Sequence, residues 1–159
     1  PGSVTLVVSK DGGEAKAGSV DCGDLLVPEG LDGGGFFFVV SYGRDEEGSF
    51  RTSVTGQEGK VESSIDTVGK HDMTGIGVRF AEALRRSQKE GLVPVVCFDS
   101  LTDLLRYNDE KSSYAFTHLM TNRLRRAGGV GHVHLDPGVV GETTVRRFER
   151  LFDGTVRAE

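Results

Sequence analysis

The chain has 159 residues, of which 36% are hydrophobic and 27% charged, and its formal net charge is −5. This length predicts one folded domain with a hydrophobic core. The acidic balance excludes nucleic-acid binding through bulk charge, although a local basic patch stays possible. No apolar run approaches the roughly 18 residues that a membrane-spanning helix needs.

The N-terminus shows no basic, then apolar, then small-residue pattern of a signal peptide, so we expect a cytoplasmic protein without membrane contact. Residues 1–3, Pro-Gly-Ser, are typical of the remnant of a cleaved expression tag. We expect residues 4–159 to form a single domain.

Short apolar runs alternate with helical patterns, which is typical of an α/β fold with a parallel sheet. The expected strands are Val4–Val8, Phe36–Tyr42, Val61–Thr67, Val93–Phe98, Val130–Leu135 and Thr155–Ala158. Apolar residues at helical spacing predict three helices, Thr74–Lys89, Ser113–Ala127 and Thr143–Phe152. The expected buried face of the first helix consists of Ile76, Phe80, Ala83, Leu84 and Ser87, and that of the second consists of Phe116, Leu119, Met120, Leu124 and Ala127. The polar, glycine-bearing segment Arg44–Lys60 predicts a long hairpin or an exposed loop.

The first apolar run is followed by GEAKAGSV, residues 13–20, in which Gly13 and Gly18 have the spacing of a phosphate-binding loop. Such a loop reads G-x-x-x-x-G-K-[ST]. Ser19 occupies the position of the lysine, and Val20 that of the magnesium-binding hydroxyl. We interpret the segment as a degenerate phosphate loop, or as an unrelated loop in its place.

The two cysteines, Cys22 and Cys97, are too few for a disulfide framework, and Cys97 lies within an apolar run. This pattern predicts buried, reduced thiols.

Three longer segments carry a resemblance to a known family. They are HDMTGIGVRFAEAL (71–84), VPVVCFDSLTDLLRYND (93–109) and RLRRAGGVGHVHLDPGVVGETTVRRFERLFDGTV (123–156). Together they resemble a family of small haloarchaeal proteins that are RecA-superfamily ATPase-like, related to KaiC and RadA, and implicated in signal transduction. The resemblance implies a RecA-like, three-layer α/β fold with a mostly parallel central sheet flanked by helices.

An ATPase of this class needs a lysine for the phosphates, a strand-end aspartate for magnesium and a carboxylate that orients water. Asp99, followed by Ser100, ends an apolar run and can be the strand-end aspartate that binds magnesium. The alternative is that Asp99 caps the next helix. In KaiC-like enzymes paired glutamates directly follow the second strand, whereas here the acids come two or three residues later, at residues 45–47. We therefore expect no efficient ATP hydrolysis and no resident cofactor.

If nucleotide binding persists, the degenerate site comprises Gly13, Gly18, Ser19, Asp99 and Ser100. Its ligand would be ATP with Mg²⁺, and any activity would depend on Asp99.

A different chemistry is offered by His132, His134 and Asp136, which alternation places on one face of a strand. Two histidines and an acid can bind zinc or another divalent metal. Pro137 stands where the metallo-β-lactamase pattern requires a further histidine. We therefore expect a core strand that ends in an Asp-Pro turn, without a metal.

Six arginines gather on two predicted helices: Arg123, Arg125, Arg126, Arg146, Arg147 and Arg150. Such runs are commonly solvated faces. The functional alternative is a basic patch for an acidic partner, a neighbouring subunit's nucleotide or nucleic acid. No aromatic residues stand beside the arginines for base stacking, which argues against single-strand binding.

The sequence therefore predicts a non-catalytic RecA/KaiC-like module that binds other proteins or itself, in signalling or gene regulation. One alternative is a weak, divergent ATPase that uses Asp99 for Mg²⁺. The other is a DNA-associated regulator that binds through its arginine-rich helix faces.

Overall fold

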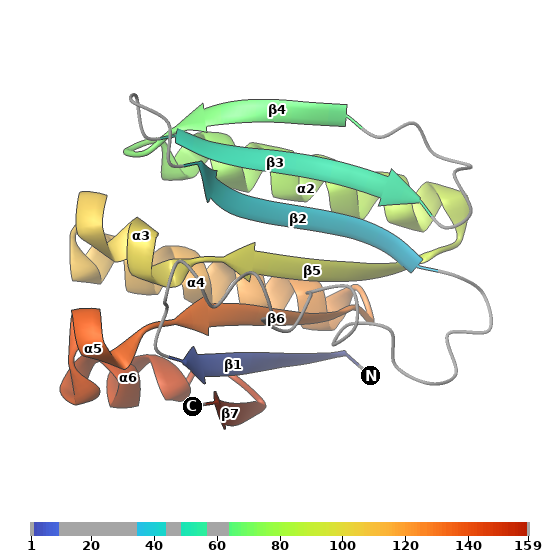
Figure 1. The fold of residues 1–159 in the computed structure, drawn as a ribbon. Helices are drawn as coiled ribbons and strands as arrows, with labels where there is room; N and C mark the ends of the chain where they lie inside the picture. Colours follow the sequence, from blue (N-terminus) through green and yellow to red (C-terminus); the bar gives the residue numbers. More distant parts are fainter. Residues whose placement is uncertain (1, 10–34, 44–48, 57–63, 159) are drawn as a thin grey trace.

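The computed structural model describes residues 2–9, 35–43, 49–56 and 64–158 (Figure 1). They form an α/β fold around a seven-stranded sheet with the order β4-β3-β2-β5-β6-β1-β7. The strands are β1 Ser3–Ser9, β2 Gly35–Gly43, β3 Ser49–Gly56, β4 Ser64–Gly69, β5 Val93–Asp99, β6 Val130–Leu135 and β7 Gly154–Ala158. The described helices are α2 Met73–Glu90, α3 Leu101–Tyr107, α4 Glu110–Arg126, α5 Pro137–Val140 and α6 Glu142–Glu149.

The sheet is mixed. Five neighbouring strands run parallel to one another, in the order β2, β5, β6, β1 and β7. At the other end β3 is antiparallel to β2, and β4 is antiparallel to β3. The prediction of a mostly parallel sheet is confirmed, and the segment Arg44–Lys60 contributes the second strand of a hairpin, β3.

The main core lies on one face of this sheet, where α2 and α4 pack (Figure 1). Alternation sends every second side chain of the central strands to this face. The side chains that meet there are apolar and almost fully buried: Val4, Leu6, Val8, Phe36, Phe38, Val40, Val96, Phe98, Val133 and Leu135. Each of the four strands β1, β2, β5 and β6 contributes two or three of them, so the sheet supplies one side of the main core.

Helix α2 follows the predicted pattern closely. Its buried residues are Ile76, Phe80, Ala83, Leu84 and Ser87, the face expected from their spacing. The Asp72 side chain accepts a hydrogen bond of 2.8 Å from the Gly75 N–H and caps the first turn. Gly91 ends the helix with a positive φ of 69°, which favours glycine.

Helix α4 corrects part of the expectation. Leu119, expected on the buried face, is 51% exposed, whereas Ser113, Thr117 and Thr121 are buried. Thr117 donates its hydroxyl proton to the Ser113 carbonyl oxygen at 2.8 Å, so a polar side chain is satisfied within the helix. The buried face is therefore rotated away from the one that apolar residues alone suggest.

Gly131 allows α4 to approach β6 closely. A Cβ atom at this position would lie 2.8 Å from Leu124 Cδ2 and 2.9 Å from the Val96 carbonyl oxygen. The second of these is a backbone atom, so a larger residue would force the sheet or the helix to shift.

The opposite face of the sheet holds a smaller cluster around Val95 and Cys97, against which Phe37, Val39 and Val130 pack. All of these residues lie on strands. A second helical layer, as the three-layer prediction requires, is not seen among the described residues. None of the described helices has the length and apolar character needed to cross a membrane.

Strand β1 lies between β6 and β7, both from the C-terminal part of the sequence (Figure 1). The Val4 N–H donates to the Asp153 carboxylate at 2.7 Å, and the Asp153 N–H donates to the Val4 carbonyl oxygen at 2.8 Å. This pair of hydrogen bonds holds β1 to the turn that enters β7.

Candidate functional site

Asp99 ends β5 at the carboxyl edge of the parallel strands, as predicted. The peptide bond between Asp99 and Ser100 is cis. Ser100 caps α3, because its hydroxyl accepts a hydrogen bond of 3.3 Å from the Asp103 N–H and donates to the Asp103 carboxylate at 2.6 Å. The capping role thus belongs to Ser100, which leaves the half-exposed Asp99 carboxylate at the edge of the sheet.

The other residues of the predicted nucleotide site, Gly13, Gly18 and Ser19, lie outside the described residues. The acids at residues 45–47 do so as well. The structure therefore places one part of that site, Asp99 with Ser100.

An aromatic cluster that sequence reasoning did not single out lies at the ends of β2 and α3. The Tyr42 and Tyr107 rings stack with their centroids 5.5 Å apart, and the Lys70 ammonium lies 4.8 Å from the centroid of the Tyr107 ring. His71 Nδ1 lies 2.6 Å from the Tyr107 carbonyl oxygen. These contacts join the end of β2 and the segment before α2 to the end of α3.

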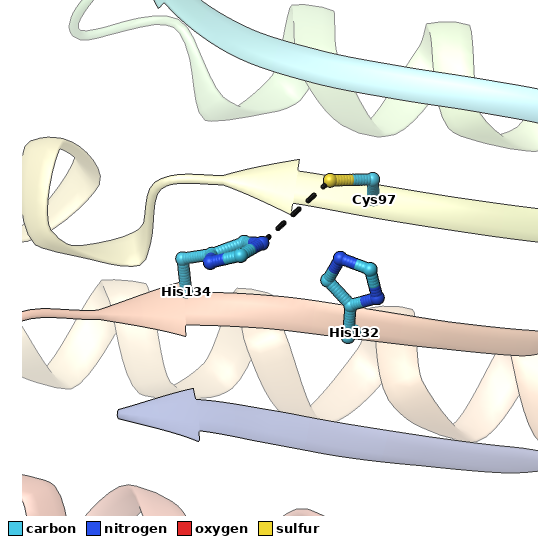
Figure 2. A group of neighbouring side chains, drawn as sticks. All are labelled: Cys97, His132 and His134. Atoms are coloured by element: carbon cyan, nitrogen blue, oxygen red, sulfur yellow. Dashed lines mark hydrogen bonds between the residues drawn. The ribbon is translucent and has the colours of Figure 1, made fainter. Parts of the chain in front are cut away.

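Cys97, His132 and His134 gather on the face of the sheet opposite α2 and α4 (Figure 2). Cys97 on β5 is the register partner of His132 on β6, and alternation places His134 on the same face. The Cys97 sulfur lies 3.9 Å from His134 Nε2, and the ligand atoms of the three side chains all lie within 4.8 Å of one another. Sulfur and imidazole nitrogen are donors that zinc prefers.

Two of the three side chains in this cluster are almost fully buried. Cys97 is 0% and His132 3% exposed, and His134 is half-buried. Burial, and secondarily the neighbouring His134, lowers the pKa of His132 from 6.5 to about 4. His132 is therefore a neutral imidazole at neutral pH.

Asp136 has a different role from the one considered in the H-x-H-x-D pattern. Its carboxylate accepts a hydrogen bond of 2.8 Å from the Gly138 N–H and caps α5, and its own N–H donates to the Thr102 hydroxyl at 2.8 Å. The acid is thus engaged in the turn after β6, as the Asp-Pro turn prediction requires. Cys97, which the pattern did not include, stands beside the two histidines instead.

Cys97 is disulfide-bonded, which corrects the prediction of a reduced thiol, whereas its predicted burial is confirmed. The sequence has one other cysteine, Cys22, which lies outside the described residues.

The six arginines have different environments. Arg125 donates to the Asp153 carboxylate at 2.9 Å, to the Asn122 side-chain oxygen at 3.1 Å and to the Leu151 carbonyl oxygen. Arg147 pairs with Glu110 at 3.2 Å. The remaining four are exposed: Arg123, Arg126, Arg146 and Arg150. Part of the predicted basic surface therefore holds the fold together.

An open groove of about 610 Å³ runs between α4 and the segment from Arg150 to Asp153, and we call it the α4–β7 groove. Arg125 from α4 and Arg150 from the other predicted face both line it, together with Tyr114, His118 and Phe152. Aromatic side chains therefore lie beside two of the arginines, which corrects the expectation that none does. Asp153 is paired with Arg125, and within the part of the chain that the structure describes Arg150 is the charged groove residue without an ion pair. The groove was not predicted, since its two walls are far apart in the sequence.

A family model described as DUF7504, a family of unknown function, matches residues 5–158 of the chain. No curated protein and no solved structure gives a significant match.

Proposed function

The chain belongs to the DUF7504 family, and we propose that this member is a non-catalytic RecA/KaiC-like module that acts by binding protein. A second copy of the chain is its proposed partner. The observation that carries this proposal is the α4–β7 groove, a basic and partly aromatic surface on an acidic chain.

The strand order supports a RecA-like core. Such a core separates the strand before the phosphate loop from the strand that ends in the magnesium-binding aspartate by one further strand. Here β6 lies between β1 and β5, and β5 ends in Asp99. In open α/β sheets, ligands bind at this carboxyl edge, next to the place where the strand order reverses.

The sequence after β1 supports a loss of catalysis. A serine at position 19 provides no cation for the phosphates, and a valine at position 20 provides no oxygen for magnesium. A missing charge-assisted contact weakens phosphate binding by about 1.5–3 kcal/mol. The same loss is larger in the transition state, where more negative charge develops on the transferred group.

Charge complementarity supports self-association. The chain has a net charge of −5, so acidic surface is abundant, whereas the groove carries the exposed Arg150. Tyr114 and Phe152 add aromatic surface, and aromatic residues and arginine are enriched at the centres of protein interfaces. An acidic segment of a second copy matches this lining.

Analytical ultracentrifugation over a range of protein concentrations tests the proposal. We expect concentration-dependent dimers that Arg150→Glu weakens at least tenfold, because the substitution reverses the charge of the groove. Arg85→Glu, at an exposed position on α2, is the matched control and should associate like the wild type. A monomer at every concentration, or an equal effect of both substitutions, would contradict the proposed surface.

The two alternatives have their own readouts. Titration of a fluorescent ATP analogue with and without Mg²⁺, followed by a phosphate-release assay, should show no magnesium-dependent turnover. Turnover that disappears in Asp99→Ala would favour the weak ATPase. DNA binding that weakens steeply with salt and depends on Arg123 and Arg126 would favour the DNA-associated regulator.

A further inference from the structure

We propose that the reduced chain binds one divalent transition-metal ion, zinc above all, through Cys97, His132 and His134. The site lies on the neighbouring parallel strands β5 and β6, and Cys97 comes two residues before Asp99 on β5. None of its three residues lines the α4–β7 groove.

The first support is geometric. Tetrahedral zinc, with Zn–S of about 2.3 Å and Zn–N of about 2.0–2.1 Å, places a sulfur and a nitrogen ligand about 3.6 Å apart. The Cys97 sulfur and His134 Nε2 are 3.9 Å apart, and the third ligand atom lies within 4.8 Å of both. Small side-chain rotations therefore suffice to close the three donors around an ion.

The second support is the way the ligands are held. Cys97 and His132 are register partners in the hydrogen-bonded pair β5–β6, and His134 is two residues further along β6. Ligands on paired strands keep their spacing better than ligands on loops. Val95, Val130 and Val39 surround the thiol side with apolar groups, which limits competition from water.

Three protein ligands leave a fourth position of the tetrahedron for water or another small ligand. His132 also borders a hollow of about 210 Å³, which is lined by Thr5, Val7 and Val156 among others. This hollow has the volume to admit a water molecule beside the cluster.

The disulfide at Cys97 makes metal binding depend on the redox state. Zinc binds the thiolate, so the disulfide must first be reduced to two thiols. A dithiol supplies the two electrons and two protons and becomes a disulfide itself, whereas a phosphine supplies the two electrons, takes the oxygen of a water molecule to become a phosphine oxide, and leaves the two protons of that water to the thiols. The Cys97 thiol then releases its proton as the sulfur–metal bond forms. The oxidised chain holds the disulfide without the ion, and the reduced chain binds the ion.

Cobalt(II) titration of the whole chain tests this inference. After reduction with a phosphine and anaerobic removal of the reductant, we expect one equivalent of cobalt to give a thiolate-to-cobalt charge-transfer band and the visible bands of a tetrahedral ion. Zinc should displace the cobalt stoichiometrically. The oxidised chain should give neither band, and a reduced chain without stoichiometric binding would overturn the proposal.

Variants identify the ligands. Cys97→Ser should abolish the charge-transfer band, and His134→Gln, at a half-buried position, should weaken cobalt binding at least tenfold; circular dichroism confirms that each is folded. His118→Gln, on the exposed face of α4, is the control and should bind normally. Cys22→Ser leaves Cys97 as the single thiol and should bind cobalt without any reductant. Failure of Cys22→Ser to bind, or full binding by Cys97→Ser, would refute the three-residue ligand set.

Discussion

Acidification should destabilise the fold through His132, the 3% exposed imidazole of β6. Its pKa is about 4 in the folded chain, against 6.5 without the fold. Between these values the unfolded chain binds more protons than the folded chain, so stability falls as the pH falls. The contribution is complete above about pH 6.5 and lost by about pH 4, and at pH 5 the loss is about 2 kcal/mol.

Urea unfolding at pH 7 and pH 5, in non-reducing buffer with a chelator, measures this contribution. The loss between the two pH values should be smaller by about 2 kcal/mol in His132→Leu, because leucine binds no proton and suits the apolar surroundings. His118→Gln should retain the wild-type pH dependence, since it leaves the buried imidazole in place. If His132→Leu and the wild type lose equal stability, the imidazole is not held neutral by burial and the reasoning fails.

Three further substitutions test the packing, each by denaturant unfolding at pH 7. Gly131→Ala should lower the free energy of unfolding by about 1–3 kcal/mol, because the new Cβ atom would meet a backbone oxygen. Gly69→Ala is the control and should cost far less, since no atom lies within 4 Å of a Cβ atom at that position. Equal effects of the two substitutions would contradict the close approach of α4. Phe148→Ala, at 0% exposure, should cost about 3–5 kcal/mol, and a loss below 1 kcal/mol would show that α6 is not part of the core. Arg125→Ala removes the contacts to Asp153 and to the segment before β7, and should cost about 1–2 kcal/mol after allowance for partial exposure; no change would mean that these bonds do not hold β7.

Elements with a strong apolar period were predictable. The buried face of α2 and the parallel strands β1, β2, β5 and β6 follow directly from the spacing of apolar residues. β3 was predicted only as part of a hairpin or an exposed loop, because in SFRTSVTG, residues 49–56, only Phe50 and Val54 are large and apolar. α3 and α5, with seven and four residues, are too short to show a helical period.

Leu119 shows that the apolar character of a residue does not always predict which face of a helix is buried. It has the right spacing for the buried face of α4, but Thr117 and Thr121 occupy the interior and Leu119 faces outward. A threonine that bonds a carbonyl in its own helix can replace an apolar residue in the core, and hydrophobicity gives no sign of this.

The candidate sites were predictable only within single elements. Strand alternation paired His132 with His134, but Cys97 lies 37 residues before His134, and only the strand order brings them together. The α4–β7 groove depends in the same way on contacts between distant segments. Asp99 was recognisable because a ligand position at the end of a buried strand is a local feature.

The place of β1 between β6 and β7 bears on how the chain acquires its fold. β1 pairs with no other described strand, and the Val4–Asp153 hydrogen bond spans 149 positions of the sequence. During translation β1 is therefore synthesised long before its two partner strands, β6 and β7. Until then the apolar side chains of Val4, Leu6 and Val8 have no neighbouring strand to pack beside. Contacts of such long range slow folding and leave an early strand open to wrong pairing during synthesis. We infer that the sheet is completed last, when β6 and β7 in the C-terminal quarter of the sequence pair with β1.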